Sequence, residues 1–518
     1  MKCTRLQSLN LIRAVIIAGI LFFQGMVPVQ NIRAQGTHDA VIRPDSTQQV
    51  IRGFGAANIL QWRPDMTADQ IIKAFGTGEG QIGLTILRLR IPPDYNGFIH
   101  NVPTAQAASE LGVTIIASPW SPPASMKTNN DLVGGRLLEE YYEDYADHLY
   151  YFVDFMESND VPIYAVSVQN EPDVQVGYES CDWNASEMLT FVREYGSYVG
   201  ARLIVPESFN FSKNLSNAIL NDSEAAENVS IIGGHIYGGG LEPYPLAASK
   251  GKELWMTEHL DTDTTWSHVF ATGKEIHDCM DAGMSAYVWW YIVRFYGPIN
   301  EDGRVTKRGY IMSQYSKFVR PGYLKIDATE RPQTQVYITA YKGESRIVIV
   351  AVNYRTSPVE QTFQINCCEN ESVSFTPYVT SQIKDCRMES SVNASAGTFT
   401  ATLEAKSITT FVSDYISNVT GDVPTPHDVR LSQNYPNPFN PETRIVYTLP
   451  EILEIKLTVR NLKGQQITVI VDETQSAGMH QVRWDGRDAN GNPVPSGVYF
   501  YRLQANDYCQ VRKMLLVR

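Results

Sequence analysis

The chain is 518 residues long, which is more than one ordinary domain needs and enough for two or three. Hydrophobic residues make up 43% of it, with 28 Tyr and 8 Trp, which indicates folding around a large core and excludes a disordered protein. The formal net charge is −13 and no Lys/Arg-rich run occurs, which excludes a nucleic-acid-binding protein. The same charge disfavours a polyanionic substrate unless a local cation overrides it.

The start of the chain is typical of a secretory signal peptide, predicted over residues 1–34. Its basic residues, apolar stretch and small residue at a cleavage position are Lys2, Arg5, Arg13, residues 14–23 and Ala34. A retained membrane anchor is the weaker alternative, because the apolar stretch is shorter than the roughly 20 residues that span a bilayer. No later segment is long enough either. We therefore expect an exported mature protein with no membrane span.

The cysteines number 7 and show no Cys-x-x-Cys or Cys/His spacing of a metal site; Cys3 lies in the signal peptide. Cys367, Cys368 and Cys386 fall in one β-rich region, where an exported protein can join Cys386 to one of the adjacent pair. We interpret these cysteines as structural. The sequence implies neither a metal nor an organic cofactor.

Between about residues 50 and 320, short strand-like runs alternate with amphipathic helical stretches, for example 138–157 and 267–281. The candidate strands end near Ala56, Arg90, Ser118, Glu171, Glu207, His235, Glu258 and Trp290. This alternation predicts an α/β fold, a (β/α)₈ TIM barrel over residues 38–320. A doubly wound open sheet is the alternative, but no Gly-x-Gly-x-x-Gly follows the first strand. Polar and aromatic residues gather just after the strand ends, where barrels form active sites.

After Pro321 the pattern changes to short strands without helical periodicity, which predicts an antiparallel β side domain over residues 321–415, tightly associated with the barrel. The predicted strands are 324–327, 335–341, 346–353, 361–365 and 407–413. The stretch 41–51 is expected to add a strand to this domain. Residues 416–427 have the Gly and Pro content of an exposed linker. Residues 428–518 are all-β with frequent turn signals, which predicts an Ig-like β-sandwich.

Two glutamates that close short apolar runs carry the strongest chemical signal. Glu171 ends the run 165–171 and Glu258 ends the run 253–258. Cleavage of a glycosidic bond requires two facing carboxyl groups, one a proton donor with a raised pKa and one a nucleophile or base. On predicted strands four and seven these carboxyls can approach to about 5 Å, the separation of a retaining mechanism. A solvated glutamate at a strand-ending turn is the alternative for each, and Glu207, which also ends a strand, competes for either role.

Several segments form one pattern in order along residues 40–415. They are Ile51-Arg52-Gly53-Phe54-Gly55-Ala56, Leu87-Arg88-Leu89-Arg90, Ala117-Ser118-Pro119-Trp120-Ser121-Pro122-Pro123, Val168-Gln169-Asn170-Glu171-Pro172, His235-Ile236-Tyr237-Gly238, Trp255-Met256-Thr257-Glu258-His259, Val288-Trp289-Trp290-Tyr291-Ile292, Lys307-Arg308-Gly309-Tyr310 and Phe318-Val319-Arg320-Pro321-Gly322-Tyr323. This pattern resembles glycoside hydrolase family 30, and more narrowly its bacterial glucuronoxylanase branch. The resemblance implies a barrel tied to a side β-domain and retaining hydrolysis of β-1,4-xylan. It also implies that Glu171 is the acid/base, Glu258 the nucleophile and Glu207 a supporting residue.

The resemblance further implies substrate-binding residues around the two glutamates. Asn170 would bind the 2-hydroxyl group of the cleaved sugar. His235 and Tyr237 end the sixth strand, and Tyr237 would hydrogen-bond the nucleophile. Apolar walls for xylose rings would be formed by Trp120, Trp290 and, with less support, Trp183. For each aromatic residue the alternative is a place in the core.

In the glucuronoxylanase branch, an Arg after the eighth strand binds the carboxylate of a glucuronic acid branch in the bidentate manner that suits a guanidinium. The segment 290–296 keeps this residue as Arg294, with Tyr296 near it. Arg294 is the local cation that can override the net negative charge. Pairing of Arg294 with a nearby Asp or Glu is the alternative.

The chain departs from this branch two residues beyond the predicted nucleophile. A Tyr is usual there, but this chain has Leu260, followed by Asp261 and Asp263. A hydroxyl donor is lost and acids are placed close to where a carboxylate would bind. The departure weakens the case for a strict glucuronate requirement and leaves the catalytic pair untouched.

A second resemblance covers about the last 90 residues. The segments that carry it are 431–441, Trp484-Asp485-Gly486 and 497–503. They are similar to a type A sorting domain of the type IX secretion route, which is related to flagellar hook-assembly Ig-like modules. The resemblance implies secretion machinery as a partner and a location outside a bacterium or on its surface. An Ig-like spacer or a carbohydrate-binding module is the alternative, and no row of exposed aromatics favours sugar binding.

The sequence thus predicts an exported, retaining endo-xylanase that acts on xylan and prefers glucuronoxylan. Another family 30 β-glycosidase, glucosylceramidase-like or a β-1,6-glucanase, is the nearest alternative, and Arg294 separates the two. A non-hydrolytic glycan-binding surface protein is the alternative from another class. The presence of both glutamates disfavours it.

Overall fold

The computed structural model describes residues 38–60, 62–343, 346–366, 373–414, 429–431, 434, 437, 439–449, 452–462, 464–476, 478–505 and 508–517. The predicted signal peptide, the predicted linker, Cys367 and Cys368 lie outside these residues. Cys386 is half-buried and forms no disulfide with another described residue. Within the described ranges, no helix combines the length and the apolar character needed to cross a membrane.

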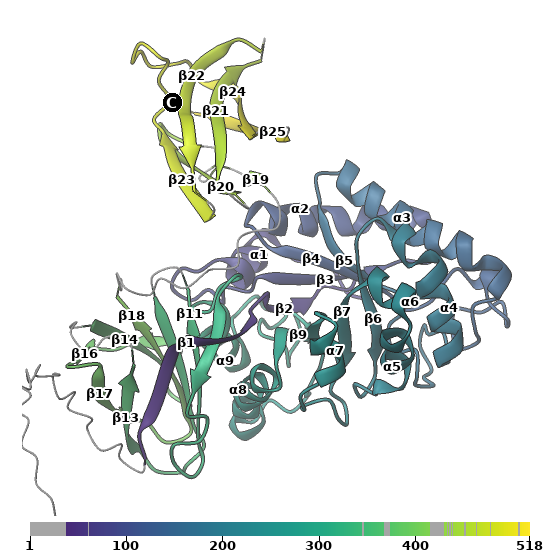
Figure 1. Cartoon of the computed structure of the whole chain (residues 1–518), viewed down its shortest axis with the longest axis horizontal. Helices are drawn as coiled ribbons and strands as arrows, with labels where there is room; N and C mark the ends of the chain where they lie inside the picture. The colour runs from purple at the N-terminus through teal and green to yellow at the C-terminus, as the bar shows by residue number, and fades with distance from the viewer. Residues whose placement is uncertain are drawn as a thin grey trace, which may run out of the picture. The chain divides into compact units, whose positions relative to one another are not determined.

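Eight parallel strands close into a barrel in chain order, which confirms the predicted (β/α)₈ fold (Figure 1). The strands are β2 (Gly53–Ala57), β3 (Ile86–Ile91), β4 (Thr114–Pro119), β5 (Ile163–Ser167), β6 (Arg202–Ser208), β7 (Val229–His235), β8 (Glu253–Glu258) and β9 (Met284–Tyr291). Each strand is buried on one face inside the barrel and on the other under helices. That is why the strands read as nearly continuous apolar runs.

The helices around the barrel are α1 (Ala68–Phe75), α2 (Val102–Glu110), α3 (Tyr142–Ser158), α4 (Ala185–Tyr195), α5 (Lys213–Asn221), α6 (Ser223–Asn228), α7 (Pro245–Ser249), α8 (Trp266–Asp281) and α9 (Lys307–Ser316). Short 3-10 helices lie at η1 (Tyr95–Asn101), η2 (Ala124–Met126), η3 (Glu139–Tyr141) and η4 (Gly196–Val199). Local sequence fixes where a helix starts, and α4 is an example. The Asn184 side chain accepts a hydrogen bond from the backbone N–H of Glu187, and the Glu187 side chain accepts one from the backbone N–H of Asn184. These two bonds form a capping box.

One layer of apolar side chains fills the lower part of the barrel interior. It consists of Ile86, Ile116, Ala165, Ile204, Ile231, Trp255, Ala286 and Val288. Successive side chains of a strand point to opposite faces, so Arg88, two residues beyond Ile86 on β3, points into the barrel above this layer. Ser118 is placed in the same way on β4. The apolar layer therefore confines polar groups to the C-terminal ends of the strands.

The end of β5 differs from the prediction. The strand ends at Ser167, so the prediction that it runs to Glu171 is wrong. Beyond the strand, the backbone N–H of Asn170 donates to the Pro119 carbonyl at 2.8 Å and that of Glu171 donates to the Glu207 carbonyl at 3.0 Å. Glu171 has a φ of 48°, which is outside strand geometry. Neighbouring strand ends, and not β5 itself, hold this segment.

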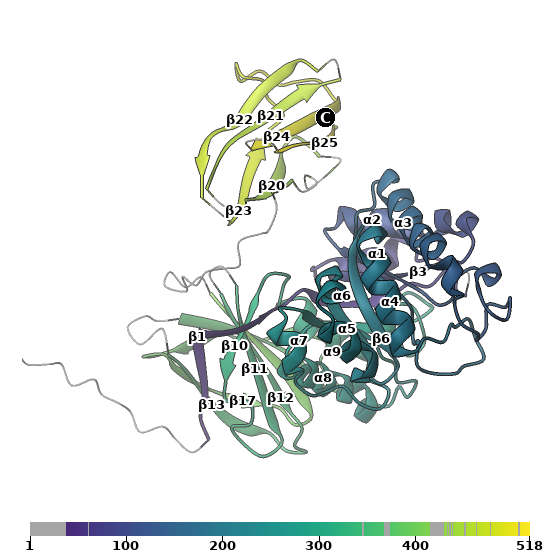
Figure 2. The same cartoon turned by 45° about the vertical axis from the view of Figure 1, so that its right-hand side comes forward.

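The side domain is a 10-stranded sheet with the order β15-β14-β18-β12-β11-β10-β1-β13-β17, and β16 also pairs with β14. Its strands are β1 (Ala40–Val50), β10 (Leu324–Ala328), β11 (Val336–Lys342), β12 (Ile347–Asn353), β13 (Val359–Ile365), β14 (Val373–Thr380), β15 (Arg387–Met388), β16 (Val392–Ala394), β17 (Thr398–Leu403) and β18 (Ser407–Ser413). The strand that precedes the barrel joins this sheet, as expected. It lies antiparallel to β10 and parallel to β13, so the predicted antiparallel sheet contains one parallel pair (Figure 2).

The side domain has its own core and is tied to the barrel through α9. The core contains the stacked rings of Phe363, Phe375 and Phe399. On the barrel side, the amide of Gln314 in α9 donates to the Thr380 hydroxyl at 2.7 Å, and its oxygen accepts from the Thr410 hydroxyl at 2.6 Å. These buried bonds join the two domains in the way that the sequence predicts.

The C-terminal domain is a β-sandwich with a separate apolar core. Its strands are β19 (Arg430–Leu431), β20 (Thr443–Leu449), β21 (Leu453–Asn461), β22 (Gln466–Gln475), β23 (Gly478–Trp484), β24 (Gly497–Ala505) and β25 (Tyr508–Leu516). They form a sheet with the order β19-β20-β23 and another with the order β22-β21-β24-β25. Trp484 packs between Phe439 and Tyr499 in this core.

Candidate active site

A buried arginine organises the mouth of the barrel. Arg88 of β3 donates from Nη1 to Oε2 of Glu258 at 2.6 Å and from Nη2 to Oδ1 of Asn170 at 2.7 Å. Its Nη2 lies 3.3 Å from the Glu207 carboxylate, and its Nε donates to the Ser118 hydroxyl at 3.2 Å. Burial lowers the pKa of Arg88, but the charges of Glu207 and Glu258 outweigh burial and raise it above its usual value. A permanent cation thus orients acceptors at the ends of β4, β5, β6 and β8.

Glu258 is fixed at the end of β8 with both carboxylate oxygens hydrogen-bonded. The Tyr237 hydroxyl donates to Oε1 at 3.0 Å, which confirms the contact expected from the family pattern, and Arg88 donates to Oε2. Near its end β8 has one residue more than β7 opposite it, Thr257, which forms a bulge. Bulges re-aim side chains, and this one precedes the turn of Glu258 toward the mouth. The carboxylate is held as an acceptor in one orientation.

Glu171 lies beyond the end of β5 and has partners on both oxygens. Oε1 lies 2.9 Å from Nδ1 of His235, and Oε2 accepts from the Tyr178 hydroxyl at 2.6 Å. The residue is only 3% exposed, whereas Tyr178, from the loop that follows, is 46% exposed. Tyr178 therefore covers Glu171 on the solvent side.

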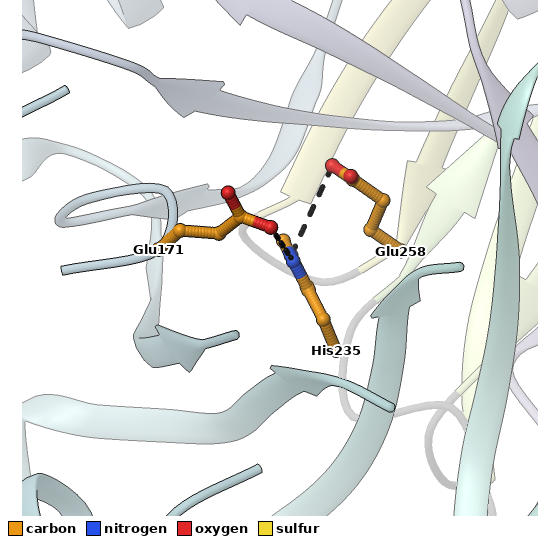
Figure 3. Close-up of side chains that lie close together, drawn as sticks. All are labelled: Glu171, His235 and Glu258. Carbon is orange, nitrogen blue, oxygen red and sulfur yellow. Dashed lines mark hydrogen bonds and ion pairs between the residues drawn. The ribbon is translucent and has the colours of Figure 1, made fainter. Parts of the chain in front are cut away.

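His235, at the end of β7, stands between the two carboxylates (Figure 3). Its Nδ1 contacts Glu171, and its Nε2 lies 4.0 Å from Oε2 of Glu258. Burial lowers the pKa of His235, but the Glu258 charge and the hydrogen bond to Glu171 outweigh burial and raise it above its usual value. Burial raises the pKa of Glu171, but His235, Tyr178 and Arg88 together hold it below its usual value. The expected raised pKa of a proton donor is therefore wrong for Glu171 in this structure.

One oxygen of Glu171, one oxygen of Glu258 and one nitrogen of His235 lie within 4.8 Å of one another. Among the described residues, this is the group whose carboxylate and imidazole atoms are spaced to hold a metal ion. Arg88 donates to Glu258 at 2.6 Å, so a positive charge already occupies one side of the group and opposes a cation. The arrangement fits a bond placed between two fixed carboxyl groups.

Glu207 does not reach the mouth. It is 0% exposed, and its carboxylate lies against Arg88 below the other two glutamates. Burial raises the pKa of Glu207, but the charges of Arg88 and His235 outweigh burial and lower it. Glu171 is 3% and Glu258 is 6% exposed, so the difference in exposure favours these two over Glu207 as the groups that touch a substrate.

Two of the three predicted aromatic walls lie at the mouth. Trp120 and Trp290 contact each other with ring centroids 5.6 Å apart, and the guanidinium of Arg88 lies 4.8 Å from the Trp120 ring. Trp120 is 2% exposed, because Trp62 packs edge-on against it at 5.4 Å. Trp183 packs among residues such as Phe191, which favours the alternative of a place in the core.

Arg294 and Tyr296 follow the end of β9. The Nη1 of Arg294 donates to Oε1 of Glu301 at 2.9 Å, so the local pairing considered from the sequence is present. Tyr296 is largely buried, with its ring 5.8 Å from the Arg294 guanidinium carbon. Burial raises the pKa of Tyr296, although the hydrogen bond and the charge of Arg294 oppose this shift.

The acids next to Leu260 bind partners at the start of α8. The Asp261 carboxylate accepts from His268 at 2.8 Å and from the backbone N–H of Asp263 at 2.9 Å. The Asp263 carboxylate accepts from the backbone N–H of Thr265, just before α8, and lies 3.6 Å from His268. Leu260 is half-buried and packs against the barrel core. These two carboxylates therefore brace the start of α8.

Comparison with known proteins gives the family of this barrel. The sequence profile of the glycosyl hydrolase family 30 TIM-barrel domain matches residues 92–196. Glucuronoxylanase XynC of Bacillus subtilis (strain 168) is 43% identical over 389 residues, which cover 72% of this chain and 91% of that protein. The chain belongs to glycosyl hydrolase family 30.

Solved family 30 structures agree with this assignment. The subfamily 8 xylanase Xyn30A from Clostridium acetobutylicum superposes with a TM-score of 0.68 at 39% identity, over 73% of this chain and 100% of that one. An endoxylanase from Clostridium papyrosolvens C71 gives a TM-score of 0.66 at 38% identity, over the same 73% and 100%. Outside the family 30 part, residues 442–508 match the FlgD Ig-like domain, in agreement with the sandwich.

Three residues of this family 30 site have no role in the sequence-based prediction. Arg88 has a visible signal, because Leu87-Arg88-Leu89-Arg90 alternates charge and leucine in a strand that is buried on both faces. Tyr178 and Trp62 lie in irregular segments after β5 and β2, where no periodicity indicates direction. Their positions follow only from the fold.

Proposed function

We propose that this chain is an endo-xylanase that cleaves β-1,4-xylan with retention of the anomeric configuration. The observation that carries the proposal is the buried pair of Glu171 and Glu258, with oxygens within 4.8 Å and His235 between them. Retaining glycosidases keep their carboxyl groups about 5–5.5 Å apart, whereas inverting ones leave about 6.5–9.5 Å for a water molecule. The short spacing favours direct attack by a carboxylate.

In the first step, Glu258 attacks the anomeric carbon while Glu171 protonates the departing oxygen. Arg88 and Tyr237 hold the Glu258 carboxylate in place for the attack. The proton for the leaving group is stored on Nδ1 of His235 and reaches Oε1 of Glu171 over 2.9 Å. As Glu258 becomes an ester it loses the charge that favours a protonated imidazole, so the proton is released when it is needed.

In the second step, the ionised Glu171 takes a proton from a water molecule that attacks the anomeric carbon. The bond between this carbon and Glu258 breaks, and Glu258 returns to a carboxylate held by Arg88. The proton returns to the pair of Glu171 and His235, which restores the starting state. Two displacements at one carbon give net retention.

The substrate assignment rests on the relatives and on the residues at the mouth. Relatives at 38–43% identity are a glucuronoxylanase and xylanases. Asn170 would bind the 2-hydroxyl group at the cleaved sugar, and Trp120 and Trp290 would line the xylose rings. Arg294 would bind the glucuronic acid branch, with Tyr296 beside it, which gives a preference for glucuronoxylan.

We also propose that the protein is exported through a signal peptide at residues 1–34 and reaches the exterior or the surface of a bacterium. The support is the basic and apolar pattern of this segment. The C-terminal domain would act as a type A sorting domain that contacts type IX secretion machinery. Its Ig-like match and its separate core suit a module with its own partner.

The experiment that tests the activity is a digestion of glucuronoxylan followed by proton NMR in the first minutes. Initial appearance of the β-anomer supports retention, and initial α-anomer contradicts it. Glu258→Gln is the control and must release no reducing ends. Release of sugar only from β-1,6-glucan or from a glucosylceramide would favour another family 30 activity. Binding of xylan without hydrolysis would favour a glycan-binding protein.

A further inference from the structure

Arg308, the second residue of α9, lies beneath the loops that follow β8 and β9. It is 1% exposed. Its Nη1 donates to the backbone oxygens of Tyr296 and, at 2.9 Å, Asp261. Its Nη2 donates to the backbone oxygen of Asp263 at 3.0 Å, and its Nε donates to the Thr272 hydroxyl at 3.1 Å. One guanidinium thus joins two loops and α8.

The acceptors of Arg308 are unusual for a buried cation, because all of them are neutral oxygens. In the described part of the chain it has no ion-pair partner, and its guanidinium carbon lies 4.6 Å from the Trp289 ring. Burial lowers the pKa of Arg308 and outweighs the charges of Asp261, Glu275 and Asp263, which act on it from nearby. A buried charge without a direct ion pair is costly, so the site tolerates Arg308 for what its geometry provides. Only the planar fork of an arginine reaches acceptors on both sides in this way.

Both loops belong to the proposed substrate site. The loop at 261–263 begins directly after Glu258 and Leu260, and the loop at 294–297 carries Arg294. Because a single nitrogen of Arg308 binds the carbonyl oxygens of Asp261 and Tyr296, it sets the spacing between the loops.

The position of Arg294 depends on this spacing. Its side chain is held by Glu301 and by the ring of Tyr296, both on its own loop. The Tyr296 backbone in turn is held by Arg308. A chain of contacts therefore runs from Arg308 through Tyr296 to Arg294.

We propose that Arg308 is a positioning residue that sets the preference for an acid-branched xylan, by fixing the Arg294 loop against the loop that follows the nucleophile. The inference rests on the proposed function and adds a specificity-determining residue to it. It also explains how the chain keeps an acidic-branch site without a Tyr at 260. The loop is held through its backbone carbonyl oxygens, which every residue offers whatever its side chain, while the carboxylates of Asp261 and Asp263 contact His268.

The test compares Arg308→Lys with a matched control, Arg320→Lys, in the full chain. Arg320 also donates to two backbone oxygens, those of Gly83 and Ser316, each at 2.7 Å. Gly83 precedes β3, so this contact lies at the opposite end of the strands from the site. Lysine keeps the charge in both variants and loses the fork. The kinetic constants are measured on glucuronoxylan and on unbranched xylo-oligosaccharides, with thermal unfolding to check folding.

For Arg308→Lys we expect kcat/KM on glucuronoxylan to fall about tenfold, mainly through KM, while unbranched substrate changes less than about twofold. Arg320→Lys must change kcat/KM by the same factor on both substrates. An equal loss on both substrates in Arg308→Lys, or no loss, overturns the inference.

A binding measurement covers the case in which Arg308→Lys is poorly active. In a Glu258→Gln background, calorimetry compares a glucuronic-acid-branched xylo-oligosaccharide with its unbranched counterpart, with and without Arg308→Lys. Loss of affinity confined to the branched ligand supports the inference, and equal loss overturns it. If the unmodified chain cleaves no xylan, the proposed function fails, and this result is distinct from any outcome with the variant.

Discussion

Nδ1 of His235 lies 2.9 Å from Oε1 of Glu171, and this contact moves the pKa values of the two groups in opposite directions. The pKa of His235 is raised above its usual 6.5, although burial by itself lowers it. The pKa of Glu171 is lowered below its usual 4.5, although burial by itself raises it. The pair therefore keeps one proton up to the raised pKa of the imidazole and loses it as the pH rises further. A carboxyl by itself would lose this proton at a lower pH.

Replacement of His235 by Asn keeps an amide donor near Glu171 but removes the ionisable group. We expect kcat/KM to fall by about 10²–10³ and the alkaline limb of its pH profile to move to lower pH, because Glu171 alone then holds the proton. The measurement is the pH dependence of kcat/KM on soluble xylan. Tyr178→Phe is the control, since it removes the other partner of Glu171 without removing a titrating imidazole, and its alkaline limb should stay in place. An unmoved limb in His235→Asn contradicts the proton store.

Arg294 forms an ion pair with Glu301, with 2.9 Å between Nη1 and Oε1. The side chain of Glu301 is 50% exposed. A substrate carboxylate has to share the guanidinium with this residue. For Glu301→Gln we expect the KM for glucuronoxylan to fall about two- to fivefold, as suits a partly exposed ion pair. Unbranched xylan should be cleaved as before. Asp302→Asn is the matched control, because Asp302 carries the same charge but pairs with the exposed Arg304.

Arg294→Ala tests the same site by removing the guanidinium group in place of its partner Glu301. Loss of a charged hydrogen bond to the branch should reduce kcat/KM on glucuronoxylan by at least about tenfold and leave unbranched xylan within about twofold. Parallel assays on the two substrates give the ratio directly. A uniform loss would show that Arg294 supports the fold of its loop and does not bind the branch.

Trp62 is the exposed edge of the aromatic cluster at the mouth. It is 36% exposed, packs edge-on against Trp120 and lies 5.3 Å from the guanidinium carbon of Arg90. A sugar ring that covers its free face would remove apolar surface from water. We expect Trp62→Ala to raise KM about tenfold with little change in kcat, because the contact exists before and during the reaction. Tyr198→Ala, which removes a 65% exposed ring from the outer helices, should leave KM unchanged.

The barrel was predictable because each of its strands has a clear sequence pattern. Strands buried on both faces read as short apolar runs, and seven of the eight predicted strand ends lie at or within a residue of the observed ends. β5 is the exception: the strand stops at Ser167, and hydrogen bonds to Pro119 and Glu207 hold the residues beyond it, which do not keep strand geometry. Such support comes from neighbours that are distant in the sequence.

The side domain was only partly predictable. β14 (Val373–Thr380) and β17 (Thr398–Leu403) alternate apolar and polar residues as half-buried strands do, but Pro377 interrupts the first and the second is short, and neither strand was predicted. The parallel pairing of β1 with β13 joins residues more than 300 positions apart, such as Ala40 and Phe363. No local pattern encodes the direction of such a pair.

The active-site glutamates were found through strand ends and family motifs, but their electrostatics were not. Arg88 gathers Ser118, Asn170, Glu207 and Glu258, which are 30, 82, 119 and 170 residues away in the sequence. The lowered pKa of Glu171 comes from His235, 64 residues away. Sequence spacing locates the strand that carries a group, whereas the charge that tunes the group comes from other strands.

The ion pair of Arg88 and Glu207 gives the last prediction, on stability. Both side chains are 0% exposed, and burial raises the pKa of Glu207 less than Arg88 and His235 lower it. A carboxyl whose pKa is lowered by folding stabilises the protein at any pH above its ordinary pKa, which is 4.5 here. The protein loses this stabilisation as the pH falls through the lower pKa of the folded state. Glu207→Gln should therefore destabilise the protein at pH 7 by about 3–5 kcal/mol, because it leaves Arg88 with one buried partner fewer.

The difference in unfolding temperature between Glu207→Gln and the unmodified protein should shrink as the pH falls below 4.5, since only the unmodified protein loses the contribution there. Thermal unfolding followed by tryptophan fluorescence from pH 7 to pH 3 measures this difference. Glu242→Gln is the matched control, because Glu242 pairs with Lys213 at 2.5 Å on the surface and its loss should leave the unfolding temperature unchanged. A Glu207→Gln difference that stays constant down to pH 3 would show that the buried carboxyl stabilises the barrel by packing and not by its charge.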